Sequence, residues 1–384
     1  MPGLCVSRTS RLVIGMVLIV LGVTQPSWVE VVNADGEGWY SSWQLRKAIT
    51  IDATKVSSGP HTNFPVLVNL TSDSSLAARA QADGDDILFT SSDGATKLSH
   101  EIEKYTSSTG ALIAWVNVPS LSSASNTVLY MYYGDAAVSS QQDASGVWDS
   151  NYKAVYHLKE DPAVAGANGI IDSTSNANHG TDNNTVGTVT GQIDGSLNFT
   201  GAGYVEAPNS TSLNISGTAT TISFWASVID NGNDSVLVEK ALAGPTAYQY
   251  AVEFDGNNAN TFDFYFRASD NTMPAFSMLP TAGVLQYGVF TYDGANVRGY
   301  LNGALAFTTA NTKSIQSSTL PFRLGVDQNG GQAYNGKLDE VRVSNVARAA
   351  GWITTEYNNQ GTPTTFYSVG SATSPTANFF QLFE

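Results

Sequence analysis

A loop rich in side-chain oxygens, residues 172–180, is the strongest candidate in the sequence for binding a cation. It carries the carboxylate of Asp172 and the amides of Asn176 and Asn178 among serine and threonine hydroxyls. Calcium takes six to eight oxygen ligands of these kinds, often from a flexible loop. The same side chains could instead hydrogen-bond to nearby backbone groups and build a turn. The loop therefore predicts either a structural Ca²⁺ or a side-chain-capped turn.

Tyrosines next to amide-rich loops could bind a glycan, because aromatic rings offer apolar area with a polar edge. Binding residues concentrate on loops, so we expect ligand contacts in the loops 255–260 and 327–332. The predicted ligand-binding residues are Tyr248, Asp255, Asn257, Asn258, Asp327, Gln328, Asn329 and Tyr334. Most of the tyrosines in this region alternate with phenylalanines, and a structural role in the core is the alternative for each of them.

No arrangement of residues in the sequence identifies a catalytic centre. A glycosidase needs two carboxylates that face the scissile bond, and the nearest approach on one strand is Glu253-Phe254-Asp255. His157 has no spacing that joins it to a mechanism, so we expect it to be structural. The sequence contains no Gly-x-Ser-x-Gly, P-loop, dinucleotide-binding glycine or His-Glu-x-x-His motif. We therefore predict no catalytic residues.

The composition limits the class of partner. Of the 384 residues 13% are charged, against about 25% in an average soluble domain, and the formal net charge is −15. Such acidity argues against nucleic acid or an anionic membrane as a partner, because nothing would neutralise the phosphates. The low charge and the many glycine, serine, threonine and asparagine residues are typical of a β-rich protein. At about 150 residues per domain, the length predicts two domains.

Residues 1–34 have the pattern of an export signal peptide. Arg8 and Arg11 precede an uncharged apolar run from Leu12 to Val23, and small residues at 33–34 form a plausible cleavage site. The run is shorter than the roughly 20 residues that span a bilayer; an uncleaved anchor is the alternative. The single cysteine, Cys5, lies in this segment. We therefore expect a secreted or cell-surface protein stabilised by its cores and not by disulfides.

Apolar periodicity predicts two β-rich regions, 39–143 and 154–366. In the first, the segment 128–133 is apolar on both faces, as in a central strand. In the second, many short strands occur at the spacing of a sandwich, and Asp293-Gly294 and Asn302-Gly303 join three of them into a meander. One helix is expected at about 347–358, and residues 367–384 read as a C-terminal tail. The predicted fold class is all-β, with two β-sandwich domains and one short C-terminal helix.

The first region resembles a bacterial and archaeal extracellular family known as the domain of unknown function DUF2341. The segments that carry the resemblance are Trp43 with Arg46–Ile51, Asn63–Val68, Asp85–Phe89, Glu101–Glu103, Ala114–Pro119 and Tyr130–Gly134. They occur in order over about 95 residues of the sequence. The resemblance does not indicate what this region does.

The second region is similar to concanavalin A-like domains of the laminin-G group. The matching segments are Ile171–Gly180, Gly195–Phe199, Tyr204-Val205, Ile222–Trp225, Tyr292–Gly294, Tyr300–Gly303 and Gly336–Val343. The resemblance implies a jelly roll of two antiparallel sheets, often used for glycan binding or adhesion. It also implies a calcium ion between the early aspartate loop and the late Leu-Asp-Glu segment. The predicted metal ligands are therefore Asp172, Asn176, Asn178, Asp339 and Glu340.

The sequence thus favours a secreted or surface-attached, non-enzymatic protein that binds glycans or a partner surface through loops of the second domain. One alternative is a carbohydrate-active enzyme, a glycoside hydrolase or polysaccharide lyase, whose carboxylates meet only in the folded chain. Another is a structural spacer or a subunit of a cell-surface array. Fold alone does not decide among these functions.

Overall fold

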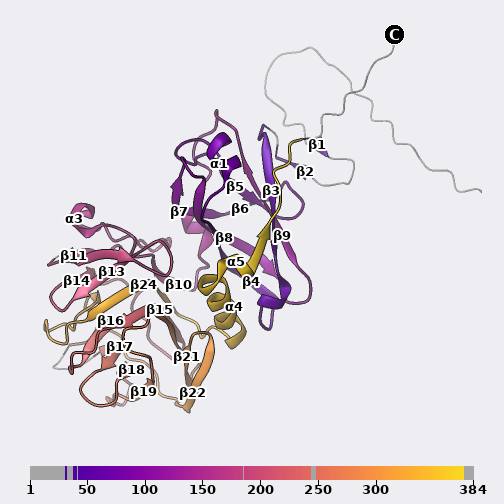
Figure 1. Cartoon of the computed structure of the whole chain (residues 1–384). Helices are drawn as coiled ribbons and strands as arrows, with labels where there is room; N and C mark the ends of the chain where they lie inside the picture. The colour runs from indigo at the N-terminus through magenta and orange to yellow at the C-terminus, as the bar shows by residue number, and fades with distance from the viewer. Residues whose placement is uncertain (1–30, 33–37, 41, 185, 244–247, 376–384) are drawn as a thin grey trace, which may run out of the picture.

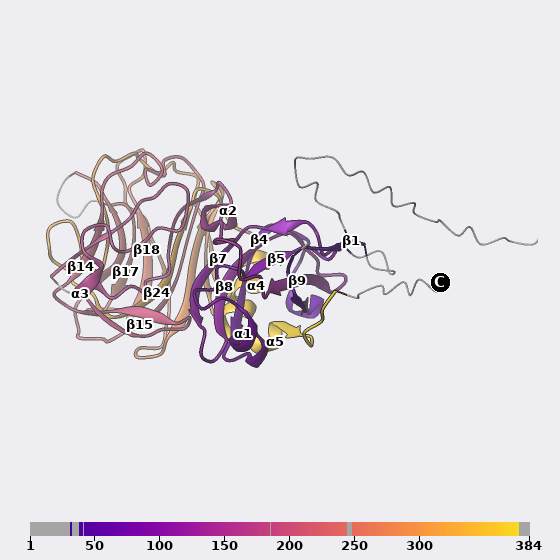
Figure 2. The ribbon, with the colours of Figure 1, turned by 90° about the horizontal axis from the view of Figure 1, so that it is seen from above.

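The computed structural model describes residues 31–32, 38–40, 42–184, 186–243 and 248–375. Within this part of the chain, two β-sandwiches lie side by side (Figures 1 and 2). The predicted signal peptide lies outside the described residues except for β1 (Val31–Val32), which pairs with β2 (Gly38–Trp39). None of the described helices is long and apolar enough to cross a membrane.

In the first sandwich, a five-stranded sheet with the strand order β25-β3-β9-β5-β6 packs against a three-stranded sheet with the order β4-β8-β7. Its elements are β3 (Leu45–Ile51), η1 (Ala53–Lys55), β4 (His61–Leu70), α1 (Ser74–Arg79), β5 (Leu88–Thr90), β6 (Lys97–Leu98), β7 (His100–Thr106), β8 (Ala111–Leu121), β9 (Thr127–Tyr133), α2 (Ala144–Val147) and β25 (Tyr367–Val369). Alternating apolar side chains such as Phe64, Val66 and Val68 are fully buried in its core. As predicted from its two apolar faces, β9 lies between two other strands.

The second sandwich packs two larger antiparallel sheets, the jelly-roll arrangement that the sequence predicted. We call β12-β13-β24-β15-β20-β21-β22, with β10 on β24, the back sheet, and β11-β14-β23-β16-β17-β18-β19 the front sheet. The elements are β10 (Tyr152–Tyr156), α3 (Pro162–Ala165), β11 (Thr181–Asn183), β12 (Gly187–Thr190), β13 (Gly195–Thr200), β14 (Tyr204–Ala207), β15 (Thr220–Val228), β16 (Ser235–Ala241), β17 (Tyr248–Asp255), β18 (Thr261–Phe266), β19 (Ala275–Met278), β20 (Gln286–Tyr292), β21 (Asn296–Leu301), β22 (Ala304–Ala310), β23 (Phe322–Leu324) and β24 (Asn335–Ser344). The predicted meander is β20-β21-β22.

After the second sandwich, the chain returns to the first. Helix α4 (Ala350–Gly361) lies between the sandwiches: Trp352 packs on Phe64 with ring centroids 4.7 Å apart, and Ile353 joins an apolar cluster on the back sheet. A short helix, α5 (Pro363–Phe366), leads into β25, which pairs with β3. Residues 367–384, predicted to be a C-terminal tail, therefore begin with a strand of the first sandwich. Residues 376–384 lie outside the described part.

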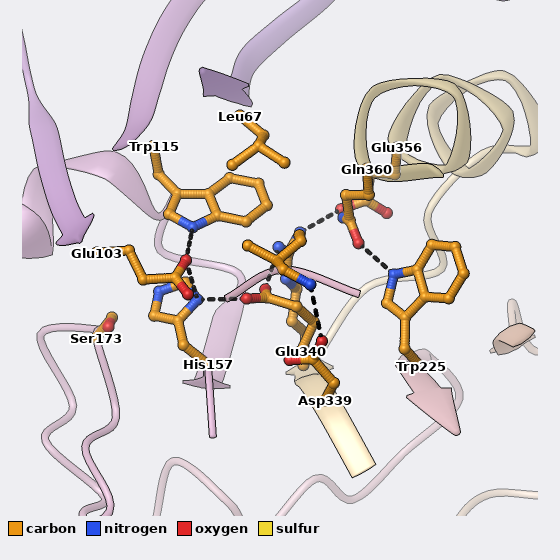
Figure 3. A network of polar contacts seen from close by, with 12 residues as sticks. Leu67, Glu103, Trp115, His157, Ser173, Trp225, Asp339, Glu340, Glu356 and Gln360 are labelled. Carbon is orange, nitrogen blue, oxygen red and sulfur yellow. Dashed lines mark hydrogen bonds and ion pairs between the residues drawn. The ribbon is translucent and has the colours of Figure 1, made fainter. Parts of the chain in front are cut away.

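Buried charged side chains fill the junction of the two sandwiches (Figure 3). Arg342 of β24 forms ion pairs with Glu340, at 2.6 Å, and with Glu356 of α4, at 3.0 Å. His157, just after β10, lies 2.7 Å from Glu340 through Nδ1. The ring of Trp115, from β8 of the first sandwich, stacks on His157 and lies under the Arg342 guanidinium. The two sandwiches thus share a polar as well as an apolar interface.

Candidate functional site

The outer face of the front sheet carries a row of acidic and aromatic side chains. Phenylalanines of β18 point into the core, so the alternating residues Asp263 and Tyr265 point outward. The strand register places Glu239 of β16 beside Ala251 of β17, and Ala251 beside Tyr265. In the next row, Glu253 of β17 lies directly opposite Asp263. Three carboxylates from three adjacent strands therefore gather on this face.

These carboxylates are buried without a full set of hydrogen-bond partners. Glu239 has no exposed surface, and neither of its carboxylate oxygens meets a donor at hydrogen-bonding geometry. One oxygen each of Glu253 and Asp263 is also unpartnered. A buried acceptor without a donor costs roughly 1–3 kcal/mol. Groups of this kind commonly mark a place where a ligand or water completes the structure.

Burial and neighbouring charges favour the protonated forms of two of these acids. Burial, reinforced by the charge of Asp327, raises the pKa of Glu239 to about 8, although the charge of Arg323 and the backbone N–H of Gln328, which lies near the carboxylate but outside hydrogen-bonding geometry, oppose the shift. Burial raises the pKa of Glu253 to about 7, with the Tyr248 hydroxyl opposing and nearby acids such as Asp263 adding to it. Perturbed carboxyls clustered on one face are typical of functional sites.

Two tyrosines and two loops border these acids. The Tyr265 hydroxyl donates to Asp263 at 3.0 Å, and the Tyr248 hydroxyl donates to Gln332 at 2.8 Å. The ring centroids of Tyr248 and Tyr265 are 6.3 Å apart. Gln328 donates to the carbonyl of Leu242 at 2.8 Å, which ties the loop 327–332 to the end of β16. We call Tyr248, Tyr265, Glu239, Glu253 and Asp263 the acid–tyrosine face.

Most of the predicted ligand-binding residues border this face. Tyr248 belongs to it, and the loops that carry the others follow β17 and β23, two strands of the front sheet. The residues on the first loop are Asp255, Asn257 and Asn258, and those on the second are Asp327, Gln328 and Asn329. Several of their side chains bond within their own loop, for example Asn258 to Asp255 and the Asn329 N–H to Asp327.

The prediction that Tyr334 binds a ligand is wrong. Its side chain is fully buried in the core between the two sheets, where its ring lies 5.6 Å from that of Phe199. Its hydroxyl donates to the backbone carbonyls of Ser227 and Lys337. A ligand on the surface cannot reach it, because its ring fills the sandwich interior and its hydroxyl pairs there.

The loop 172–180, which the sequence predicted to be either a cation site or a side-chain-capped turn, contains the capped turn. One Asp172 oxygen accepts from the N–H groups of Val155 and Thr174, and the other accepts from the N–H of Asn178 and the hydroxyl of Thr174. The amides of Asn176 and Asn178 donate to backbone carbonyls of β10. The carboxylate is therefore fully engaged with the protein itself.

The remaining predicted metal ligands bond elsewhere. Asp339 accepts from the N–H groups of Gln192 and Ile193, whereas Glu340 pairs with His157 and Arg342. Adjacent strand residues normally face opposite sides, but β24 has a bulge here, and Glu340 adopts a positive φ of 51°. The five predicted ligands thus lie in three separate hydrogen-bond networks. The calcium ion itself stays a prediction.

Glu239 and Asp263 were not among the predicted site residues. Asp263 lies in the alternating run Phe262–Phe266, so its outward direction was readable from the sequence. Glu239 follows three apolar residues, Val236–Val238, and has no such signal. Its closeness to Glu253 arises from strand pairing, which a search for acids on a single strand does not detect.

Comparisons with known proteins agree with the two-part architecture. Residues 199–354 match the family model of the concanavalin A-like lectin/glucanases superfamily, and residues 83–159 match that of DUF2341. A search of curated proteins gave no match.

Similar solved structures include domain 4 of AbnA, a GH43 extracellular arabinanase from Geobacillus stearothermophilus, in complex with arabinotriose. It is 19% identical with a TM-score of 0.43, and the match covers 53% of this chain and 97% of that one. The binding domain of Paraclostridial Mosquitocidal Protein 1 is 12% identical, with a TM-score of 0.44 and coverage of 54% and 52%. The chain thus matches about half the length of that toxin domain. The family models therefore identify a DUF2341 segment followed by a concanavalin A-like segment, the architecture expected from the sequence.

Proposed function

We propose that this chain is a secreted or surface-attached protein that binds a glycan on the acid–tyrosine face. The observation that carries the proposal is that Glu253 and Asp263, two acids with unpartnered carboxylate oxygens, keep a small exposed surface beside the half-buried ring of Tyr265, whereas Glu239 lies beneath the surface. Sugar hydroxyls are donors that could satisfy these oxygens, and each satisfied acceptor removes a desolvation cost. The match to a lectin and glucanase superfamily supports the same class of ligand.

The face offers the two kinds of contact that a sugar uses. The half-buried ring of Tyr265 provides an apolar surface for the C–H face of a pyranose or furanose. Asp263 and Glu253 lie next to that ring and accept hydrogen bonds. The exposed amides of Asn257 and Asn258 at the border can then contact the next sugar along the chain.

Substitutions on this face are expected to weaken glycan binding by tenfold or more, about 1.4 kcal/mol. The protein is screened on a glycan array, and binding of a positive glycan is then measured by calorimetry with Tyr265→Ala and Asp263→Asn. Tyr204→Ala is the matched control, because Tyr204 lies on the same sheet four strands away, beside Arg323. An unchanged affinity in both test variants would contradict the proposal.

A second candidate function is glycoside hydrolysis at the same place. Glu253 and Asp263 face each other on neighbouring strands, which puts their Cβ atoms roughly 5 Å apart. A raised pKa on one acid beside a second carboxylate is the arrangement of a general acid with its partner. Release of reducing sugar from a positive glycan, abolished in Glu253→Gln, would select this function. Binding without release selects the non-enzymatic one.

Two further expectations are tested by the same screen. The array is run with Ca²⁺ and with a chelator, and loss of binding in the chelator would support the calcium predicted at the loop 172–180. The absence of any glycan signal under both conditions would favour the structural spacer.

The buried Glu239 is expected to make stability fall with rising pH. Its folded-state pKa is about 8, against 4.5 for an ordinary glutamate. Between these values the folded chain keeps a proton that the unfolded chain has lost, so the free energy of unfolding decreases as pH rises and levels off above about 8. The groups that set the shift are Asp327, Arg323 and Glu253.

Glu239→Gln removes this titration while keeping the shape of the protonated side chain. Relative to wild type, the variant is expected to gain stability of the order of a few kcal/mol between pH 5 and pH 8.5. Urea unfolding of both proteins at the two pH values measures the difference, in which the titration of other acids cancels. Parallel pH dependences of the two proteins would show that Glu239 is ionised throughout.

A further inference from the structure

Three side chains from both sandwiches converge at the buried junction. Glu103 comes from β7, His157 follows β10, and Glu340 lies on β24. One ligand atom from each lies within 4.8 Å of the others, and all three residues are buried. Figure 3 shows the side chains pointing toward one another. A search of the described residues for three or more His, Cys, Asp or Glu side chains close enough to share an ion finds this group.

We propose that Glu103, His157 and Glu340 bind a divalent transition-metal ion that joins the two sandwiches. An imidazole nitrogen with two carboxylates is a ligand set that Zn²⁺ and related ions accept. Calcium prefers oxygen ligands alone, so this site differs in its ligands from the predicted calcium site, with which it shares only Glu340. Because the ligands come from both sandwiches, the ion would act in the structure and not on a substrate.

The groups around the three ligands hold them as the partners of a metal site do. Nδ1 of His157 faces Glu340 at 2.7 Å and Glu103 at 3.5 Å. Its other nitrogen, Nε2, lies 3.4 Å from a carboxylate oxygen of Glu101. A histidine ligand usually donates its second N–H to a carboxylate in this way, which fixes the ring and its tautomer. Glu101 is held in turn by Ser173, at 2.7 Å, and by Trp148.

The two carboxylate ligands are oriented as well. One oxygen of Glu103 accepts from the indole of Trp115 at 2.8 Å, and one oxygen of Glu340 accepts from Arg342 at 2.6 Å. The second oxygen of Glu103, Oε1, is buried and has no hydrogen-bond partner. This unpartnered oxygen is a second, independent observation that points to a cation-binding position, because a buried carboxylate oxygen otherwise requires a donor.

The balance of charge also favours a cation. Within the described part of the chain, the carboxylates of Glu101, Glu103, Glu340 and the helix residue Glu356 form ion pairs with two basic side chains, His157 and Arg342, while Lys159 donates to the backbone carbonyl of Glu103. Burying uncompensated carboxylates is costly. A divalent ion between Glu103 and Glu340 would compensate them, with a neutral His157 as its nitrogen ligand.

The test measures metal in the full chain after folding in its presence, because the junction is closed to solvent. Protein produced with added ZnCl₂ is washed with a chelator, and its metal content is determined by mass spectrometry. Wild type is expected to retain about one Zn²⁺ per chain, and Glu103→Gln less than about a tenth of that. Glu206→Gln, which removes an acid of β14 on the front sheet, is the control and is expected to bind zinc like wild type.

A network of ion pairs without metal gives a different result. Glutamine at position 103 can still accept from Trp115, so a purely structural network tolerates the substitution and neither protein retains zinc. Zinc-free wild type, or equal zinc in wild type and Glu103→Gln, overturns the proposal. If Glu103→Gln does not fold, the visible absorption spectrum of wild type loaded with Co²⁺ is measured instead. The intense absorption of a low-coordinate site supports the proposal, and the weak spectrum of hydrated Co²⁺ overturns it.

Discussion

Replacing Arg342 with alanine is expected to destabilise the folded chain by about 3–5 kcal/mol. The Arg342 side chain is almost completely buried and forms ion pairs with both Glu340 and Glu356. Its guanidinium also lies over the rings of Trp115 and Trp148, at 4.5 and 4.9 Å. Removing it leaves the buried Glu356 without its ion-pair partner and Glu340 with His157 alone, and it opens a cavity beside two indoles. Denaturant unfolding at neutral pH measures the effect.

The matched control is Arg298→Ala. Arg298 also forms an ion pair, with Asp293, but both side chains are about one-third exposed. Exposed pairs contribute roughly 0–1 kcal/mol, because water solvates the ions when the pair is broken. Equal destabilisation by the two substitutions would show that the Arg342 ion pairs are not desolvated. It would contradict the claim that buried ion pairs stabilise the junction.

Ending the chain after Arg348 is expected to unfold the first sandwich, although every strand in the predicted range 39–143 is retained. The deleted segment buries Trp352 and Phe366 in the core of that sandwich. It also supplies β25, and Asn359 bonds to both backbone groups of Leu67 in β4. Deleting one large aromatic side chain from a core costs about 3–5 kcal/mol, and here several are lost at once. Such a loss is comparable with the whole stability of a domain.

Limited proteolysis with mapped cleavage sites measures the unfolding of each sandwich separately. The truncated chain is expected to be cleaved rapidly in residues 45–133, whereas a chain that ends after residue 375 keeps all the described elements and is expected to resist. Protection of the first sandwich in the shorter chain would mean that α4 and β25 are dispensable. Separate mapping is needed because two sandwiches need not unfold in a single transition.

Features that depend on local sequence were predictable. The alternation of Phe262, Phe264 and Phe266 with polar residues predicted a half-buried strand, and β18 has that burial pattern. Asp293-Gly294 and Asn302-Gly303 predicted the turns of the β20-β21-β22 meander. In each case the pattern and its consequence lie within a few residues, because strand periodicity and turn geometry are local properties.

Features that depend on packing between distant segments were not predictable. Nothing near Tyr367 indicates that it pairs with Ile51, more than 300 positions earlier. The bulge at Glu340, which turns this residue toward His157, is set by the pairing of β24 with β15.

By itself, the sequence determined that this protein consists of β-sandwiches with apolar cores, since side-chain alternation dictates which face of each strand is buried. Only the tertiary structure decided which acids lie together. Glu239, Glu253 and Asp263 are neighbours because three strands pair in one register, and Glu103 reaches His157 because the two sandwiches dock. Register and docking follow from the packing of the whole chain, which no short segment encodes.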